Sequence, residues 1–233
     1  MDVTPPITRV HWKHCWRVIP TRYPSEDLLD RVVDPKDAEA IQALDALTNT
    51  RLRLERGELN FLPSGEMKKD PGSQYIMASF CYSIFNKSRF SDGAYGVYYG
   101  ADRLSTAVDE TCFHREEFMR ATAEGPMMLT MRVLDAALDG KLHDIRGMKH
   151  KYAAVYSANS YSHSQELGSH LWAKGSHGIV YDSVRHAKGE CVAIFKPSLL
   201  TRCHQERTLL YEWNGSKIGK IYELHEFVEI KKR

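Results

Sequence analysis

Two features are missing from the sequence: a long apolar run and an excess of charge of one sign. No segment has the roughly 20 apolar residues that a membrane-spanning helix needs, and the N-terminal segment lacks the hydrophobic core of a signal peptide. Lysine and arginine total 32 against 30 aspartates and glutamates, a formal net charge of +2. Nucleic acids and anionic membranes usually bind a concentrated basic face, so we expect neither as a partner. We expect a cytoplasmic protein, and an anionic ligand would have to be a small molecule held by a few arginines.

Cysteine is scarce and scattered. The five cysteines form no C-x-x-C pair, and their odd number argues against a disulfide framework. His11 and the His14-Cys15 pair have a spacing seen in metal sites, but alternation along a strand would divide them between two faces. No second pair completes a zinc site. We therefore expect reduced, mostly structural thiols and no metal.

The composition, 42% hydrophobic and 27% charged over 233 residues, predicts one well-packed domain spanning residues 1–233. Hydrophobic patterning predicts strands and helices in an irregular order. The expected strands cover 10–19, 95–99, 127–134, 178–184 and 190–195, and the expected helices cover about 34–49, 75–85, the segment after Asp102 and 164–174. A C-terminal hairpin over about 206–230 is expected to have a two-residue turn at Asn214-Gly215. Because the elements do not repeat as βαβ units, we predict an α+β fold with a mixed or mostly antiparallel sheet and flanking helices.

The segment from Arg89 to Glu110 contains residue types that suit a phosphorylated sugar. Gly96 and Gly100 bracket an aromatic strand and let its backbone approach a flat ligand. Arg89 precedes this strand and suits a bidentate grip on phosphate oxygens, while Tyr99 offers an aromatic face. Glu110 follows in the first turns of the next helix. The same residues also fit a surface arginine, a core tyrosine and a solvated glutamate, so their types alone do not decide between a site and a scaffold.

A series of motifs resembles the RES domain, a family named for an arginine, a glutamate and a serine. The motifs are WRVIPTRYP at 16–24, LTNTRLR at 47–53, RFSDGAYGVYY at 89–99, TAVDET at 106–111, GIVYDSVRH at 178–186 and CVAIFKP at 191–197. They define a core over about 15–200, and the C-terminal hairpin follows it. By this resemblance Arg89, Glu110 and Ser183 match the three residues that name the family.

The resemblance implies a fold similar to ADP-ribosyltransferase domains and NAD as the substrate. It implies cleavage of the nicotinamide–ribose bond with phosphate or water as acceptor, so that NAD is a substrate and inorganic phosphate a co-substrate, with no further cofactor. It also implies a toxin that an antitoxin with an Xre-like helix-turn-helix silences. Tyr99 matches the tyrosine before the family's helix, and Arg17 matches a further recurrent arginine. Asp182 stands where many relatives have proline, a departure that bears on the position of the Ser183 loop.

The chemistry of these residues agrees with that activity. Nicotinamide leaves as a neutral molecule, so the barrier lies in the oxocarbenium-like ribose, which a carboxylate stabilises. We expect Glu110 to supply this charge and Tyr99 to hold the nicotinamide ring. Arg89, together with Arg17, would hold the pyrophosphate or an incoming phosphate. Ser183 would hydrogen-bond ribose or the nicotinamide amide, since no G-x-S-x-G motif marks it as a nucleophile.

Two other functions are consistent with the same residues. An enzyme of similar fold transfers ADP-ribose to a macromolecule instead of to a small acceptor. A non-catalytic module would only hold NAD or a partner protein, although the intact set of four matched residues argues against it. Arg185 and His186 fit either contacts behind the site or plain surface positions. If Arg17, Arg89 and Arg185 converge, the third arginine favours phosphate over water as the acceptor.

Overall fold

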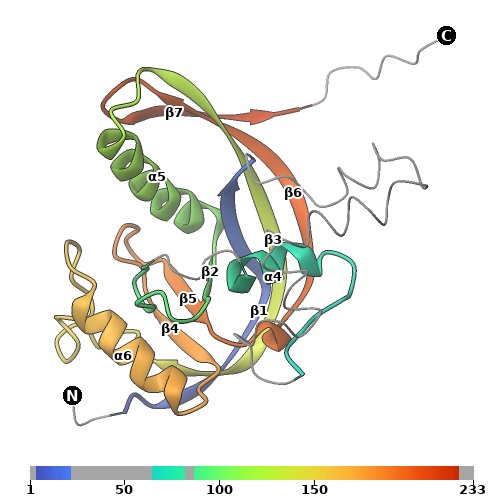
Figure 1. The fold of residues 1–233 in the computed structure, drawn as a ribbon, viewed down its shortest axis with the longest axis vertical. Coiled ribbons are helices and arrows are strands. Elements are labelled where there is room, and N and C mark those ends of the chain that lie inside the picture. Colours follow the sequence, from blue (N-terminus) through green and yellow to red (C-terminus); the bar gives the residue numbers. More distant parts are fainter. Residues whose placement is uncertain (1–3, 22–64, 82–86, 226–233) are drawn as a thin grey trace.

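The computed structural model describes residues 4–21, 65–81 and 87–225 (Figure 1). The strands are β1 (Ile7–Pro20), β2 (Tyr98–Ala101), β3 (Met127–Asp144), β4 (Gly178–Asp182), β5 (Glu190–Ile194), β6 (Leu200–Trp213) and β7 (Ile218–Leu224). The helices are α4 (Ser73–Cys81), α5 (Leu104–Ala121) and α6 (Ser162–Ala173), with a 3-10 turn at Pro197–Leu199. Within these ranges no helix is both long and apolar enough to cross a membrane.

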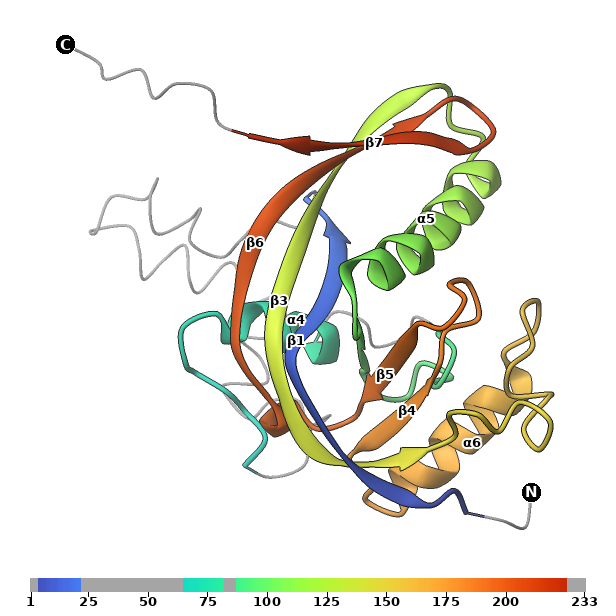
Figure 2. The same ribbon diagram turned by 180° about the vertical axis from the view of Figure 1, so that it is seen from behind.

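One sheet organises the fold, with strand order β1-β2-β5-β4-β3-β6-β7. Neighbouring strands are antiparallel except β3 and β4, which run parallel. Because β1 also pairs with β3, strands β1, β2, β5, β4 and β3 close into a ring, and β6 and β7 extend from it. Figure 2 shows β3 and β6 curving together along the length of the molecule. The prediction of an α+β fold with a mixed, mostly antiparallel sheet is confirmed.

Alternate side chains of the strands enter two hydrophobic clusters on opposite faces of the sheet, as the two-residue period of a strand requires. The α5/α6 cluster combines strand residues such as Val18 and Tyr181 with residues of helices α5 and α6. The α4 cluster combines strand residues such as Cys15 and Tyr98 with residues of helix α4. Neighbouring residues of one strand therefore lie on different faces: Tyr98 belongs to the α4 cluster, and Tyr99 packs against the α5/α6 cluster.

Most predicted elements are present, with differences at their ends. Strand β3 continues to Asp144, well beyond residue 134, and β2 begins only at Tyr98. The two-residue turn predicted for the hairpin is wrong, because Trp213 pairs with Ile218 across a four-residue loop. The Asn214 side chain closes this loop by accepting hydrogen bonds from the N–H groups of residues 216 and 217. The helix expected over 34–49 lies outside the described residues.

Two local contacts fix the elements that surround the later site. The Asp102 side chain accepts the N–H of Glu190 at 2.9 Å and joins the segment before α5 to β5. The turn that contains Phe90 rests on α6 at Gly168, where a β-carbon would come within 2.2 Å of the Phe90 carbonyl oxygen. Only glycine permits this approach of turn and helix. The start of α5 is thereby held against β5, and the turn at residues 88–91 is held against α6.

Candidate functional site

The carboxylate of Glu110 and the hydroxyl of Ser183 form one hydrogen-bonded unit. Glu110 lies on the second turn of α5, and Ser183 directly follows β4. The Ser183 hydroxyl donates to Glu110 Oε1 at 2.6 Å, a length typical of a hydroxyl–carboxylate bond. Among the described residues nothing hydrogen-bonds to the second oxygen, Oε2. The glutamate is therefore held in one orientation with one oxygen free to meet a ligand.

The backbone after β4 fixes the Ser183 hydroxyl in turn. Ser183 is buried, and its Oγ accepts the N–H groups of Arg185 at 3.1 Å and His186 at 2.9 Å. With both lone pairs engaged, the hydroxyl directs its only proton to Glu110. The expected hydrogen bond from Ser183 to ribose or the nicotinamide amide stays a prediction. In the structure the Ser183 hydroxyl bonds to the Glu110 carboxylate, and the backbone amides of residues 185 and 186 fix the position of that hydroxyl.

Tyr99 supplies an aromatic ring on the same face of the sheet. Its hydroxyl accepts the N–H of Phe90 at 2.9 Å and forms a 2.8 Å hydrogen bond with the hydroxyl of Ser88. Burial raises the pKa of Tyr99 to about 12, so the phenol keeps its proton at neutral pH. The hydroxyl therefore anchors the turn at residues 88–90, and only the half-buried ring remains for a flat ligand.

Arg89 is buried and partly engaged. Its Nη1 donates to the carbonyl oxygens of Val155 at 3.2 Å and Ser157 at 3.0 Å, and its guanidinium lies 4.6 Å from the ring centre of Tyr161. These contacts tie the segment between β3 and α6 to the site. Among the described residues no hydrogen bond involves Nε or Nη2 of Arg89. Nε and Nη2 of the Arg89 guanidinium can therefore donate hydrogen bonds to an anion.

Arg185 and His186 brace the Ser183 loop from outside. Arg185 Nη2 donates to the carbonyl oxygen of Ala158 at 2.6 Å, and its guanidinium stacks 3.3 Å from the ring centre of Phe113. Its Nε is buried without a hydrogen-bond partner among the described residues. His186 Nδ1 lies 2.6 Å from a carboxylate oxygen of Asp109 on α5. Both side chains therefore contact the site's supporting elements, one of the two alternatives that the sequence left unresolved.

Arg17 does not join this group. Its guanidinium lies 4.8 Å from the ring centre of Tyr98 and donates to the carbonyl oxygen of Tyr99 at 2.9 Å. Tyr98 belongs to the α4 cluster, so Arg17 lies on the face of the sheet opposite the Glu110 carboxylate. Burial lowers its pKa from the ordinary value. The condition that three arginines converge is therefore not met: among the described residues Arg89 and Arg185 lie on the Glu110 side of the sheet, and Arg17 does not.

Two further residues near the glutamate were not predicted. His114 lies one helical turn after Glu110 on the same side of α5; burial lowers its pKa, and Glu110 partly opposes that shift. Tyr156 supports the loop through its hydroxyl, which donates to the Ile145 carbonyl and accepts the N–H of Asp182 at 3.1 Å. The four-residue spacing of Glu110 and His114 in a predicted helix could have identified His114. No local sequence pattern indicated Tyr156.

Asp182, the departure from the family pattern, makes a hydrogen bond of its own beside Ser183. Its carboxylate accepts the N–H of Gly147 at 2.9 Å, while the Ser183 N–H donates to the Gly189 carbonyl at 2.8 Å. The aspartate thus binds the segment after β3, which a proline side chain has no means to do. In the part of the chain that the structure describes, no group of three or more His, Cys, Asp or Glu side chains is placed to hold a metal ion.

Replacing Ser183 with Ala tests the role of the hydroxyl. We expect a loss of about 1–3 kcal/mol of unfolding free energy, because the amides of residues 185 and 186 lose their acceptor in a buried place. The catalytic rate should fall about tenfold or more, since the carboxylate loses its fixed orientation. Thermal unfolding and steady-state kinetics measure both effects. Ser216→Ala in the exposed β6–β7 loop is the matched control, and equal behaviour of the two variants would contradict the role.

Comparisons with known proteins agree with the motifs. The sequence matches the RES domain family over residues 68–214. It is 29% identical over 208 residues to the protein y4oC of Sinorhizobium fredii, which covers 89% of this chain and 86% of y4oC. A solved structure, the MbcT–MbcA toxin–antitoxin complex of M. tuberculosis, is similar with 9% identity and a TM-score of 0.46 over 89% of this chain and 87% of the matched one. Because the family match spans more than half of the sequence and includes Arg89, Tyr99, Glu110 and Ser183, this chain belongs to the RES domain family.

Proposed function

We propose that this chain cleaves the nicotinamide–ribose bond of NAD. The observation that carries the proposal is the 2.6 Å hydrogen bond that fixes Glu110 and leaves its second carboxylate oxygen free. As nicotinamide departs with the electron pair of the bond, positive charge develops at the anomeric carbon and the ring oxygen of ribose. A fixed carboxylate lowers the energy of that charge without reorganisation at the moment of reaction. Glu110 is the stabilising residue, and Ser183 is a positioning residue that acts through it.

The other residues serve binding in this proposal. The half-buried ring of Tyr99 provides a face for nicotinamide, and the free nitrogens of Arg89 suit the pyrophosphate. Arg17 has no direct role, because it lies across the sheet. No cofactor is required, since the leaving group departs neutral and no redox step occurs. NAD is the substrate, and the family resemblance suggests a cytoplasmic toxin that an Xre-like antitoxin holds inactive.

Inorganic phosphate is the acceptor that we favour. Arg185 supports this choice because its Nε is a buried donor without a partner, beside the loop that carries Ser183. A phosphate oxygen held there would bond to the anomeric carbon and give ADP-ribose 1″-phosphate and nicotinamide. Water would give ADP-ribose, and a macromolecular acceptor would give a modified protein or nucleic acid. With Arg89 assigned to the pyrophosphate and Arg17 across the sheet, Arg185 is the cation that supports phosphorolysis.

Product identity tests the proposal. Purified protein is incubated with NAD in phosphate buffer and in a phosphate-free buffer of equal ionic strength, and the products are identified by mass spectrometry. We expect ADP-ribose 1″-phosphate, formed at a rate that rises with phosphate concentration. Plain ADP-ribose at a phosphate-independent rate would replace phosphate with water as the acceptor. Unchanged NAD in both buffers would contradict the proposal that the protein cleaves NAD.

A further inference from the structure

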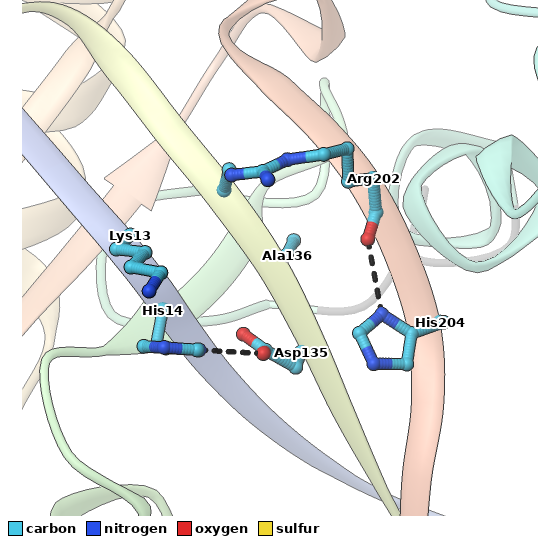
Figure 3. Close-up of a pocket in the computed structure, with 7 residues that line it drawn as sticks. Lys13, His14, Asp135, Ala136, Arg202 and His204 are labelled. Atoms are coloured by element: carbon cyan, nitrogen blue, oxygen red, sulfur yellow. Dashed lines mark hydrogen bonds and ion pairs between the residues drawn. The ribbon is translucent and has the colours of Figure 1, made fainter.

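A second polar site lies on strands β1, β3 and β6, built from residues that the proposed reaction does not use. The hollow has a volume of about 170 Å³ and is lined by Lys13, His14, Asp135, Ala136, Ala137, Arg202 and His204 (Figure 3). Liquid water occupies about 30 Å³ per molecule, so the hollow has room for a small oxyanion with a few waters but not for a dinucleotide. Its polar lining requires an explanation.

Two β-bulges face each other across β3 at this hollow. On one side Lys13 and His14 together oppose the single residue Ala137, because the register shifts between positions 12 and 15 of β1. On the other side Arg202 and its neighbour oppose Ala136, because the register shifts again between Asp135 and Ala137. Bulges redirect side chains and are common beside functional sites. Each of these bulges brings cationic side chains to the same hollow.

The backbone at Arg202 is strained for an arginine. Its φ is +54°, in the left-handed region that glycine and asparagine adopt more readily. Figure 3 shows its side chain extending from β6 across β3 toward Lys13. The exposed guanidinium does not form a core contact that would account for this conformation. Strain of this kind typically persists where the side chain serves a ligand.

Asp135 supplies the only acidic side chain of the lining. The residue is 6% exposed, and its Oδ2 lies 2.7 Å from Nδ1 of His14. Its Oδ1 is buried and has no hydrogen-bond partner in the part of the chain that the structure describes. A buried carboxylate oxygen without a donor is costly, so a bound molecule that donates one hydrogen bond would stabilise the site. The hollow therefore offers one open acceptor beside several donors.

We propose that this hollow binds inorganic hydrogenphosphate. The lysine and arginine outnumber the aspartate, so a small anion fits the charge better than a cation or a zwitterion. An ammonium group would need three acceptors, whereas one is open. Hydrogenphosphate carries one P–OH that donates to Asp135 Oδ1, and its remaining oxygens accept hydrogen bonds from Lys13 and Arg202. Sulfate and a phosphomonoester dianion have similar shape and charge but lack that proton. The inference is independent of the proposed reaction at Glu110.

The site is tested by its selectivity for an anion that carries a P–OH group over anions that lack one. The full chain is titrated with phosphate, sulfate and glycerol 3-phosphate at pH 8 and equal ionic strength, and the ring signals of His14 and His204 are followed by NMR. We expect phosphate to shift both signals and to bind at least tenfold more tightly than the other two anions. Equal binding of phosphate and sulfate, or no shift of these signals at millimolar phosphate, would overturn the proposal.

Two variants separate binding from folding. Asp135→Asn replaces the acceptor with an amide that also donates, so phosphate and sulfate should then bind equally. Arg202→Gly relieves the positive φ, so thermal stability should be retained while phosphate binding weakens about tenfold. Glu110→Gln leaves the hollow intact and should not alter either histidine shift. The proposal would be contradicted if the Asp135→Asn protein still preferred phosphate to sulfate, or if the Arg202→Gly protein bound phosphate with wild-type affinity. The hollow would then be a water-filled feature of the surface.

Discussion

Replacing Glu110 with Gln is expected to lower the rate of NAD cleavage by at least about a hundredfold, with the fold retained. The amide keeps the shape of the side chain and can still accept the Ser183 hydroxyl, whose oxygen lies 2.6 Å from Oε1. It removes the negative charge that faces the developing ribose cation, a loss of about 3 kcal/mol of transition-state stabilisation. Steady-state kinetics and thermal unfolding, measured together, separate chemistry from stability.

The matched control is Glu117→Gln on the same helix. Glu117 is exposed and lies 3.9 Å from His114, and it makes no contact with the Ser183 loop. We expect this variant to keep a rate close to that of the wild type. If Glu110→Gln stays within tenfold of the wild type, Glu110 has no part in the chemistry and is only a helix residue.

Arg89→Lys is expected to reduce kcat/KM for NAD by about ten- to a hundredfold, mainly through a higher KM. Lysine cannot make the two parallel bonds of a guanidinium to an anion in addition to the two loop carbonyl bonds, because it has only three donors on a single nitrogen. It also loses the stacking on Tyr161, whose ring centre lies 4.6 Å from the guanidinium. Since Arg89 is buried and holds the segment around residues 155–157, thermal stability should fall as well.

Stability and binding can be told apart in this variant. Arg9→Lys is the control, since Arg9 forms an exposed ion pair with Asp139 at 2.8 Å near the start of β1. Exposed pairs contribute little, about 0–1 kcal/mol, so this control should behave like the wild type. An Arg89→Lys protein with lower stability but an unchanged KM would make Arg89 a scaffold residue only.

Local patterns in the sequence predicted much of the fold. Aromatic and β-branched runs located β1, β4 and β5, an apolar run indicated α4, and local patterning indicated α6, because these signals depend on neighbouring residues. The length of β3 was missed because its second half follows pairing with β1 and β6 rather than local propensity. The hairpin loop was missed because the Asn214 side chain, rather than the backbone alone, closes it.

The sequence could identify the residues of the site, but it could not predict the contacts between them. Glu110 and Ser183 are 73 positions apart, and they meet because β2 and β4 both pair with β5, which brings α5 beside the end of β4. Family motifs identified both residues, whereas only the structure shows that they bond to each other. The face of the sheet on which Arg17 lies was readable from the sequence. Strand alternation puts it on the face opposite Trp16 and Val18, which pack with the α5/α6 cluster.

The amount of nicotinamide released from NAD by the purified protein tests the central claim most directly. If the Glu110–Ser183 unit cleaves the glycosidic bond, nicotinamide appears in amounts equal to the NAD consumed, over many turnovers, and no ADP-ribose remains on the protein. Chromatography with mass detection measures the released nicotinamide and any ADP-ribose attached to the protein. Recovery of intact NAD after prolonged incubation with stoichiometric enzyme, at a protein concentration where binding is demonstrable, would contradict the account and leave a domain that only binds.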